Sequence, residues 1–351
     1  MKDHSTINRP ARRATLGDIA RRAGVTAGTV SGVLKGKAKE RRISDDVVER
    51  VRQAAAEIDY APNLLVHSLR HGRTHIMSFF NGFRMRDKGD LYMDGLSAAI
   101  EQAAGGLGFN TLICCDFSLD AETTYRYING GTNDGLIFFK PQVDDPLLPY
   151  LRKSQLPVVL LNTEDEAGVL SSVTDDWQAG MVQVADALVR LGHRKIGALV
   201  SPLPSGDAKD RVAQLSELLK LRGVEMPQRW MIPADAKQPA GVNEALRRLM
   251  TDSDSPTALF CWHDSLGYVA LEECDNLGIS VPGDLSIIGY DGVRWPAKTK
   301  HTLASVYVNL GVMGETAVHL LHRLIDGGQS PIRRVLPTTL DHGTTLAPPR
   351  D

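Results

Sequence analysis

Residues 15–34 read TLGDIARRAGVTAGTVSGVL, and this stretch decides the fold of the first part of the chain. Thr15 followed by Asp18 resembles a capping box, so a helix is expected to begin there. Gly24 breaks that helix, and Thr26 is suited to cap a second one. The apolar residues of both helices recur at helical spacing: Leu16, Ile19, Ala20, Ala23, Val30, Val33 and Leu34. Two short helices joined by a glycine-containing turn are typical of a helix-turn-helix.

A third helix is predicted after residue 44. Ser44 is a good N-cap, and Asp45 and Asp46 suit the positive end of a helix dipole. Apolar residues follow at helical spacing, and Pro62 disfavours helix in the residue before it. On periodicity alone, a generic three-helix bundle fits as well as a DNA-binding domain.

The charge is divided unevenly along the 351 residues, although the net charge is only −2. Residues 1–75 hold 15 Lys and Arg against 8 Asp and Glu, a balance of +7, and the remainder holds 25 against 34, a balance of −9. A basic head on an acidic body favours contact between the head and a polyanion. The alternative is an ordinary solvated face.

Two strings in this region resemble the head of the LacI/GalR repressor family. They are TLxDIAxxAGVTxxTVS over residues 15–31 and VxxAAxEIxYxPN over residues 51–63. The resemblance implies an all-α helix-turn-helix DNA-binding domain, residues 1–62, that binds pseudo-palindromic operator double-stranded DNA. It also implies a homodimer, because two-fold related half-sites need two heads. Residues 347–351 carry no heptads, so a tetramer built by a C-terminal coiled coil is not expected.

By the same resemblance, three positions of the second helix face base edges in the major groove: Ala27, Gly28 and Gly32. None has a side chain that hydrogen-bonds, although an alanine can touch a thymine methyl. A basic loop follows, with Lys35, Lys37, Lys39, Arg41 and Arg42, and it is slightly longer than usual for the family. Its cations are expected to neutralise phosphates. The predicted DNA-binding residues are Thr15, Thr26, Ala27, Gly28, Thr29, Ser31, Gly32, Lys35, Lys37, Tyr60, Asn63, His67, Leu69 and Arg70.

Residues 63–74 are predicted to be a hinge. In the family, the matching segment forms a short helix on DNA, and its leucine, here Leu69, opens a central base step in the minor groove. The alternative is that Leu69 only anchors a linker. Val66 and His67 replace the usual alanine and arginine, which puts hinge tightness and one phosphate contact in question. Because Ala27, Gly28 and Gly32 offer no side-chain hydrogen bond and Leu69 acts at the centre, we hypothesise that base specificity concentrates at the central step and is shallow in the flanks.

From residue 75 onward, short apolar runs alternate with amphipathic helical patterns, which favours parallel strands buried on both faces. Strands are predicted at 76–80, 111–115, 135–139, 158–161, 196–200, 258–262 and 286–289. Helices are predicted at 91–104, 178–191, 211–222, 241–250, 265–277 and 310–325. The pattern predicts an α/β body of doubly wound type, with two lobes.

Further strings resemble the effector domain of the same family, which has the fold of periplasmic sugar-binding proteins. They are GLxxAIE from residue 95, DGLIF from 134, PVVLLN from 157, LGHRKI from 191 and VPGDLSIIGYD from 281. The resemblance implies an effector-binding and dimerisation domain over residues 75–351. Lobe 1 would hold about 75–174 and 308–334, and lobe 2 about 175–307 and 335–351, with three chain crossings between them.

Ligands of open α/β sheets bind beyond the carboxyl ends of the strands. By resemblance, Arg211, Asp264 and Asp291 match effector-binding positions, and Asn162 matches a position often held by aspartate. The alternative for both aspartates is that they cap the next helix or turn. The predicted effector-binding residues are Phe80, Asn81, Asn162, Arg211, Trp262, His263, Asp264 and Asp291.

Carboxylate and guanidinium groups suit vicinal sugar hydroxyls, so the small-molecule effector is expected to be a sugar or a sugar derivative. His263 and Trp262 depart from the family, which usually has asparagine and a small residue there. The basic loop at 83–88 would favour an anionic or otherwise non-sugar ligand, unless it is solvated surface. The sequence therefore predicts a transcriptional regulator, with repression favoured over activation, controlled by a ligand between two lobes.

Other classes of protein fit less well. A solute-binding protein would need a secretory signal, which residues 1–18 lack, and no DNA-binding head. An enzyme is not expected, because the glycines at 105, 106 and 108 end a helix instead of following a strand. His67, His71 and His75 have helical spacing, but Gly72 interrupts it, so no metal site is predicted. We expect no cofactor, no membrane span, a cytoplasmic and nucleoid-associated location, and reduced, buried cysteines.

Overall fold

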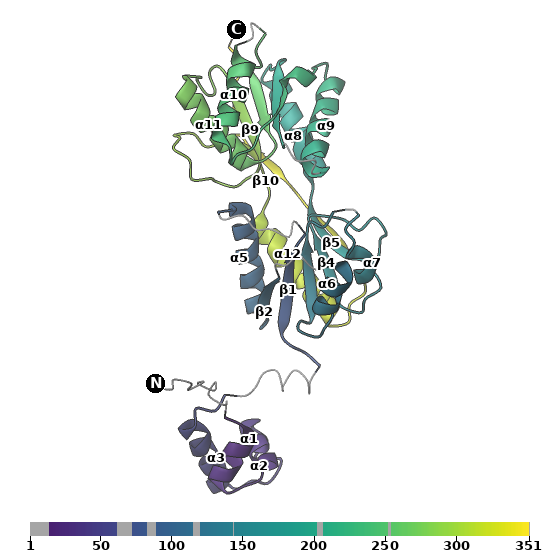
Figure 1. The fold of residues 1–351 in the computed structure, drawn as a ribbon, viewed down its shortest axis with the longest axis vertical. Helices are drawn as coiled ribbons and strands as arrows, with labels where there is room; N and C mark the ends of the chain where they lie inside the picture. Colours follow the sequence, from purple (N-terminus) through teal and green to yellow (C-terminus); the bar gives the residue numbers. More distant parts are fainter. Residues whose placement is uncertain are drawn as a thin grey trace, which may run out of the picture. The chain divides into compact units, whose positions relative to one another are not determined.

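The computed structural model describes residues 14–61, 72–82, 89–114, 120–142, 144–201, 206–251 and 254–350. The chain divides into two compact units, Met1–Thr74 and His75–Asp351. We call them the head and the body, and each is described by itself (Figure 1).

The head is a three-helix unit of α1 (Leu16–Ala23), α2 (Ala27–Leu34) and α3 (Asp45–Glu57). The predicted capping box is confirmed, because Asp18 N donates to Thr15 Oγ1 while Thr15 N donates to Asp18 Oδ2. Gly24 ends α1 with a φ of 66°, a left-handed conformation that favours glycine. The small core is formed by Ile19, Ala20, Ala23, Val30, Val33, Val51 and Ala54.

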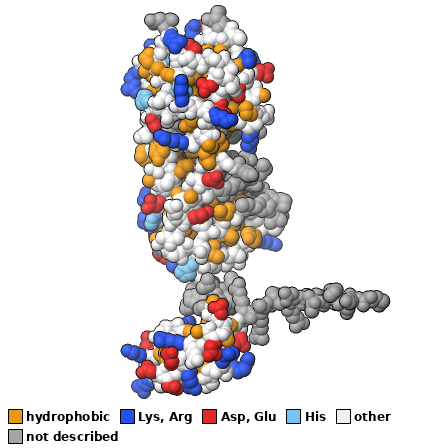
Figure 2. All heavy atoms as spheres, turned by 90° about the vertical axis from the view of Figure 1, so that its left-hand side faces the viewer, with side chains coloured by type: hydrophobic (Ala, Val, Ile, Leu, Met, Phe, Trp, Pro, Cys, Tyr) orange, Lys and Arg blue, Asp and Glu red, His pale blue; other side chains and the backbone are white. Residues whose placement is uncertain are grey.

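Leu34 does not join this core, contrary to the sequence prediction. It is 39% exposed at the last position of α2. One residue turns a helix by about 100°, so Val30 and Val33 face α1 and α3 while Leu34 is rotated away from them. Figure 2 shows basic and acidic side chains side by side on the exposed surface of the head.

The body contains two six-stranded sheets, A and B. Sheet A has the order β11-β5-β4-β3-β1-β2, and sheet B has the order β12-β10-β9-β8-β6-β7. Neighbouring strands pair in parallel except β10 and β12, which are antiparallel. The strands of sheet A are β1 (Ile76–Asn81), β2 (Asn110–Cys114), β3 (Gly135–Phe139), β4 (Val158–Leu161), β5 (Ser171–Asp175) and β11 (Arg333–Leu336). Those of sheet B are β6 (Ile196–Val200), β7 (Met231–Pro233), β8 (Ala258–Cys261), β9 (Ser286–Asp291), β10 (Ala304–Tyr307) and β12 (Thr339–Asp341).

Helices cover both faces of each sheet, which confirms the doubly wound α/β prediction. On sheet A, α5 (Leu91–Gly106) packs with α12 (Leu310–Ile325), while α6 (Ala121–Ile128) and α7 (Leu148–Leu151) belong to a separate core. On sheet B, α8 (Trp177–Arg190) packs with α9 (Gly206–Leu221), and α10 (Pro239–Met250) packs with α11 (Asp264–Leu277). The short 3₁₀ helix η1 (Gln228–Trp230) precedes β7.

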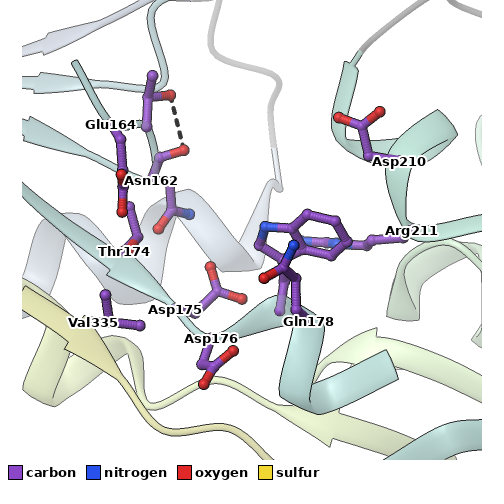
Figure 3. Close-up of a pocket in the computed structure, with 11 residues that line it drawn as sticks. Asn162, Glu164, Thr174, Asp175, Asp176, Gln178, Asp210, Arg211 and Val335 are labelled. Atoms are coloured by element: carbon purple, nitrogen blue, oxygen red, sulfur yellow. Dashed lines mark hydrogen bonds between the residues drawn. The ribbon is translucent and has the colours of Figure 1, made fainter. Parts of the chain in front are cut away.

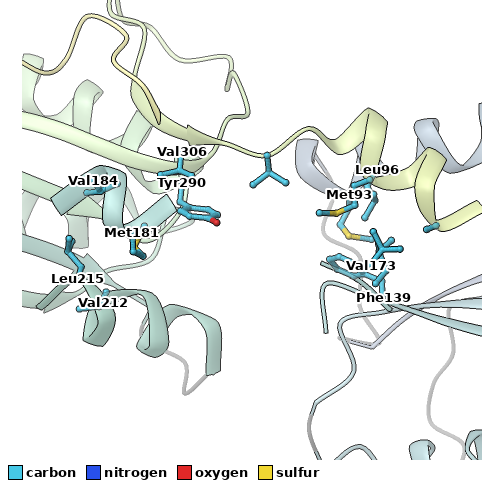
Figure 4. Packing of buried hydrophobic residues seen from close by; sticks show 14 of the residues in the cluster. Met93, Leu96, Phe139, Val173, Met181, Val184, Val212, Leu215, Tyr290 and Val306 are labelled. Carbon is cyan, nitrogen blue, oxygen red and sulfur yellow. The ribbon is translucent and has the colours of Figure 1, made fainter. Parts of the chain in front are cut away.

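The interior is apolar on each side of the sheets. Figure 4 shows one group of buried side chains on sheet A, with Met93, Leu96, Phe139 and Val173, and another beside Tyr290 on sheet B. At about 25 cal/mol per Å² of apolar surface, burial of such side chains is the main term that holds each lobe together. The described cysteines Cys114, Cys261 and Cys274 are free and buried, as expected.

Three chain segments join the sheets, between β5 and α8, between β10 and α12, and between β11 and β12. The first and third segments are hydrogen-bonded to each other: Asp176 N donates to Leu336 O at 2.8 Å, and Thr338 Oγ1 donates to Asp176 O at 2.9 Å. Gln183 of α8 holds the third segment at two points, through Thr338 O and Leu340 N. We call these bonded segments the hinge crossings. They are separate from the hinge predicted at residues 63–74.

Candidate DNA-binding and effector sites

Helix α2 begins at a well-formed cap. Thr29 N donates to Thr26 Oγ1 at 3.2 Å, and the two hydroxyls lie 2.9 Å apart. The first-turn residues Ala27 and Gly28 are exposed, whereas Gly32, one turn later, is buried. A buried glycine on this short helix needs a cover from elsewhere in the chain.

Arg41, from the loop between α2 and α3, provides that cover together with Ile43. A Cβ added at Gly32 would lie 2.9 Å from Arg41 Cδ and 3.2 Å from Ile43 Cδ1. Arg41 Nη1 donates to the carbonyl oxygen of Gly28 at 3.0 Å. Gly28 and Gly32 leave one face of α2 without side chains, and the guanidinium of Arg41 lies on that face.

The other predicted DNA-binding residues are distributed over the head. Thr15 is engaged in the cap of α1, and Lys35 stands at the C-cap of α2. Lys37 Nζ lies 3.7 Å from Glu40 in an exposed ion pair, and Tyr60 packs against the core. Ser31 is half-buried. Asn63, His67, Leu69 and Arg70 lie outside the described residues, as do Val66 and most of the predicted hinge.

In the body, a cavity of about 250 Å³ lies at the first hinge crossing. Figure 3 shows Asn162, Glu164, Thr174 and Val335 of sheet A and its loops on one side, and Asp210 and Arg211 of α9 on the other, with Asp175, Asp176 and Gln178 between them. Thr163 and Trp177 complete the lining. The cavity therefore takes its walls from both lobes, and most of its lining residues are polar.

Arg211 is the central cation of this site. It is 8% exposed, its Nη1 donates to Trp262 O at 3.2 Å, and it lies 3.7 Å from Asp291 Oδ1. Its guanidinium carbon stands 3.6 Å from the ring centre of Tyr290. Tyr290 is fully buried, and its hydroxyl donates to Asp175 Oδ2 at 2.5 Å. Helix α9 begins at residue 206, so Arg211 lies within the helix instead of opening it as predicted.

The charge of Arg211 acts on two ionisable groups, Asp291 and Lys140. Burial raises the pKa of Asp291 to about 7, against the opposing charges of Arg211 and Lys140. Burial lowers the pKa of Lys140 to about 8, and the positive charge of Arg211 acts in the same direction. Lys140 follows β3 on sheet A, so cations and carboxylates from both sheets interact across the hinge crossings.

Asn162 follows β4 in a left-handed conformation with a φ of 57°. Lys140 and Asp291, which also stand at strand ends, have φ values of 48° and 112°. Backbone strain of this kind clusters at ligand sites. Asn162 Nδ2 donates to the hydroxyl of Tyr92, while its Oδ1 is buried with no hydrogen-bond partner among the described residues, as is Trp262 Nε1. An unsatisfied buried acceptor and an unsatisfied buried donor are therefore present for a ligand to engage.

Asp264 and His263 have structural contacts in this structure. Asp264 is 2% exposed and accepts from Val293 N and Ser305 Oγ, each at 2.6 Å. His263 caps α11 by accepting from Leu266 N through Nδ1. Burial, helped by the charge of Arg211, lowers the pKa of His263 to about 3, so the ring is neutral near pH 7. Their roles as effector ligands stay predictions.

The remaining two candidates end β1. Phe80 is 2% exposed and its ring lies 5.0 Å from that of Phe138 within the core that contains α6 and α7. Successive strand residues point to opposite faces. Phe79 accordingly joins the other core, with Phe139 and Met93. Asn81 is half-buried at the strand end and pairs in register with Phe139.

Sequence reasoning missed Tyr92, Lys140 and Asp175. Lys140 could have been predicted, because it directly follows the predicted strand at 135–139, just as Asn162 directly follows the predicted strand at 158–161. Asp175 ends β5, which the sequence analysis does not predict. Tyr92 lies in the first turn of α5, and nothing in its surroundings in the sequence distinguishes it.

The described ranges also bear on membranes and metals. None of their helices is long and apolar enough to cross a membrane. Within the same ranges, no three His, Cys, Asp or Glu side chains gather as a metal site would require. The ring of His75, considered above as a metal ligand, lies 5.5 Å from that of Phe109.

Comparisons with known proteins agree with both units. A family model described as bacterial regulatory proteins, lacI family, matches residues 15–63, and one described as periplasmic binding protein-like domain matches residues 185–346. The HTH-type transcriptional repressor PurR of Escherichia coli O1:K1 / APEC is 28% identical over 324 residues, covering 91% of this chain and 92% of that protein. The PurR repressor of Photobacterium profundum is 26% identical over 311 residues, covering 88% and 91%.

Solved structures share the fold over nearly the whole chain. The lac repressor dimer bound to operator and the anti-inducer ONPF has a TM-score of 0.81 at 22% identity, with 96% of this chain and 100% of that chain covered. The complex of the transcriptional regulator CelR with cellobiose has a TM-score of 0.65 at 25% identity, covering 95% and 100%. The chain belongs to the LacI/GalR family of DNA-binding transcriptional regulators, with a helix-turn-helix head and a periplasmic-binding-protein-like effector domain.

Proposed function

We propose that this regulator is a repressor whose operator affinity is set by a neutral, polyhydroxylated effector, a sugar or a close derivative, bound at the first hinge crossing. The observation that carries the proposal is the cavity around Arg211, lined from both lobes and mostly by polar residues. A ligand that touches both lobes favours one lobe arrangement over another, and only such differential affinity can shift a conformational equilibrium. Its relatives named PurR are transcriptional repressors, which favours repression here.

The effector class follows from the charges in the wall of the cavity. Glu164, Asp175, Asp176 and Asp210 line it together with the cation Arg211. Repulsion from these carboxylates disfavours a sugar acid or a sugar phosphate. Carboxylates and a planar guanidinium suit the paired hydroxyls of a neutral sugar. The cellobiose held by the related regulator CelR belongs to this chemical class. The basic loop at 83–88, which would favour an anion, lies outside the described residues.

Effector contacts are proposed for Asn162, Arg211, Trp262 and Asp291. Arg211 and Asn162 line the cavity itself. Trp262 and Asp291 contact or face Arg211, and the Nε1 donor of Trp262 has no partner in the part of the chain that the structure describes. The packed side chain of Phe80 makes it a weaker candidate than these four, and Asp264 would act by holding the segment at Val293.

The domain limits are proposed as residues 1–62 for the head, 63–74 for the hinge and 75–351 for the body. A homodimer would place two heads on two operator half-sites about one DNA turn apart. In that assembly, residues of α2 and the basic loop would meet the major groove and phosphates, and the hinge would meet the minor groove.

The test has two steps, and the first is a thermal-shift screen of neutral sugars, sugar acids and nucleosides. A ligand that binds only the folded state stabilises it by RT ln(1 + [L]/Kd), about 2.7 kcal/mol at a concentration of 100 Kd. A neutral sugar should raise the melting temperature, and the corresponding acid should not. A hit among the acids or nucleosides alone would overturn the assigned effector class.

The second step measures operator binding by fluorescence anisotropy, with a duplex selected from a random pool. Arg211→Ala should remove the response to the effector while leaving operator affinity without effector close to that of wild type. Lys220→Ala is the matched control, because it removes one cation from the exposed side of the same helix. If Arg211→Ala responds at wild-type effector concentrations, the site assignment is wrong.

A further inference from the structure

The basic loop between α2 and α3 does more than present charges to solvent. Its start is bonded to α2, since Lys37 N donates to Gly32 O at 2.9 Å, and within the loop Arg41 N donates to Lys37 O at 3.1 Å. Ile43 N closes the loop by donating to Ala38 O at 2.9 Å. These bonds fix the start of the Arg41 side chain beside α2.

The two glycines of α2 have different relations to this side chain. Any side chain at Gly32 would displace Arg41, because a Cβ there would lie 2.9 Å from Arg41 Cδ and 3.3 Å from Arg41 Nη1. Gly28 is open, as a Cβ there would meet only Thr26 Oγ1, at 3.7 Å. Arg41 Nη1 reaches the carbonyl of Gly28 in the first turn. The guanidinium therefore lies along the N-terminal half of α2, at the level of residues 28 to 32.

From this geometry we infer that Arg41 is a base-reading residue, which takes the place of the side chains that Gly28 and Gly32 lack and recognises a guanine in each half-site. The inference rests on the proposed function, in which α2 enters the major groove with its N-terminal residues toward the base edges. A guanidinium has five N–H donors in a planar fork, and Gly28 O engages one of its nitrogens. Guanine presents N7 and O6 as two acceptors that match this fork.

The other cations of the loop differ from Arg41. Lys37 pairs with Glu40, and Lys39 and Arg42 are exposed. Such residues suit phosphates, which add affinity without reading sequence. Arg41 is held in place before DNA arrives, so less side-chain entropy is lost when it binds a defined acceptor pair. The sequence analysis expected weak base discrimination outside the central step. The inference instead predicts one strongly discriminated base pair in each half-site outside that step.

The experiment compares wild type, Arg41→Ala and Lys39→Ala in the full-length protein. Selection from a random duplex pool first gives the preferred site of the wild type. Each base pair of one half-site is then changed in turn, and Kd is measured at one fixed salt concentration. Wild type should lose about 5- to 150-fold in affinity when one G·C pair outside the central step is replaced. Arg41→Ala should bind the original and replaced duplexes alike at that position.

Lys39→Ala should weaken binding to all duplexes by a similar factor and keep the preference for the G·C pair. Gly32→Ala should behave like Arg41→Ala, because its methyl group displaces the arginine. Far-ultraviolet circular dichroism on each variant checks that the head stays folded. The inference is overturned if Arg41→Ala keeps every base preference of the wild type, whether its overall affinity falls or not. A wild type that enriches no sequence at all would instead contradict the proposed operator binding.

Discussion

Replacing Tyr290 by phenylalanine removes one oxygen atom from the contact between β9 and the first hinge crossing. The hydroxyl donates to Asp175 Oδ2 at 2.5 Å, Tyr290 is fully buried, and Asp175 is 8% exposed. The ring itself stays, so the stacking of Arg211 over residue 290 is retained. The variant therefore isolates a single hydrogen bond between the two halves of the body.

The expected cost follows from the chemistry of the acceptor. A hydrogen bond to a charged group contributes about 1.5–3 kcal/mol, and its loss leaves a buried carboxylate oxygen short of a donor. For a unit of this size, about 1 kcal/mol corresponds to roughly 2–4 °C in melting temperature. Tyr290→Phe should thus melt about 3–12 °C below wild type.

Differential scanning fluorimetry of the full chain measures this shift. Tyr307→Phe on the neighbouring strand β10 is the matched control, because that tyrosine is 43% exposed and its loss should change the melting temperature little. Asp175→Asn and the double variant complete a cycle, whose coupling energy should be at least about 1 kcal/mol. A Tyr290→Phe variant that melts within about 1 °C of both wild type and the control would refute the reasoning.

Three other predictions concern Asp291, Thr15 and two lysines of the basic loop. Burial raises the pKa of Asp291 from 3.8 to about 7 in the folded state. The free energy of unfolding that protonated Asp291 contributes is therefore fully present below about pH 4 and is lost as pH rises through 7. Asp291→Asn should therefore gain on wild type by up to about 4 kcal/mol between pH 4 and 8 in urea titrations, and a pH-independent difference would contradict this. Thr15→Ala should cost the head about 1 kcal/mol by loss of the cap of α1, seen as faster amide exchange in that helix, whereas Thr15→Ser should not. Replacing Lys37 and Lys39 by alanine should flatten the slope of log affinity against log salt by up to about one unit per lost contact, and an unchanged slope would place the loop away from DNA.

The strands that could be predicted are those that consist of near-continuous apolar residues. All seven predicted strands are present in the structure, with ends that differ by no more than two residues. Strand β5 was missed because its sequence, SSVTD, contains mostly polar residues. Its serines are buried because tertiary contacts satisfy them: Ser171 Oγ accepts from Ile332 N at 3.0 Å, and Ser172 N donates to Ile332 O at 2.9 Å. Asp175 was missed with it, since a strand end is a candidate only once the strand is recognised.

The head shows a second limit of sequence reasoning. The spacing of apolar residues and caps predicted its three helices, and the resemblance identified the face of α2 that meets DNA. The position of Arg41 depends on how the connection between α2 and α3 folds back onto α2. Local propensity does not determine such a contact, because it is made between residues that are 13 apart in the chain. Only the structure could show that the glycine face is covered.

The hinge crossings have a consequence for how the body moves. Asp176 and Leu336 belong to different crossings and are bonded to each other, and Gln183 holds the third crossing at Thr338 and Leu340. Chain segments joined in this way cannot twist independently without breaking several of these bonds together. A rearrangement of the two lobes that keeps these bonds must therefore move the first and third crossings together, as one unit.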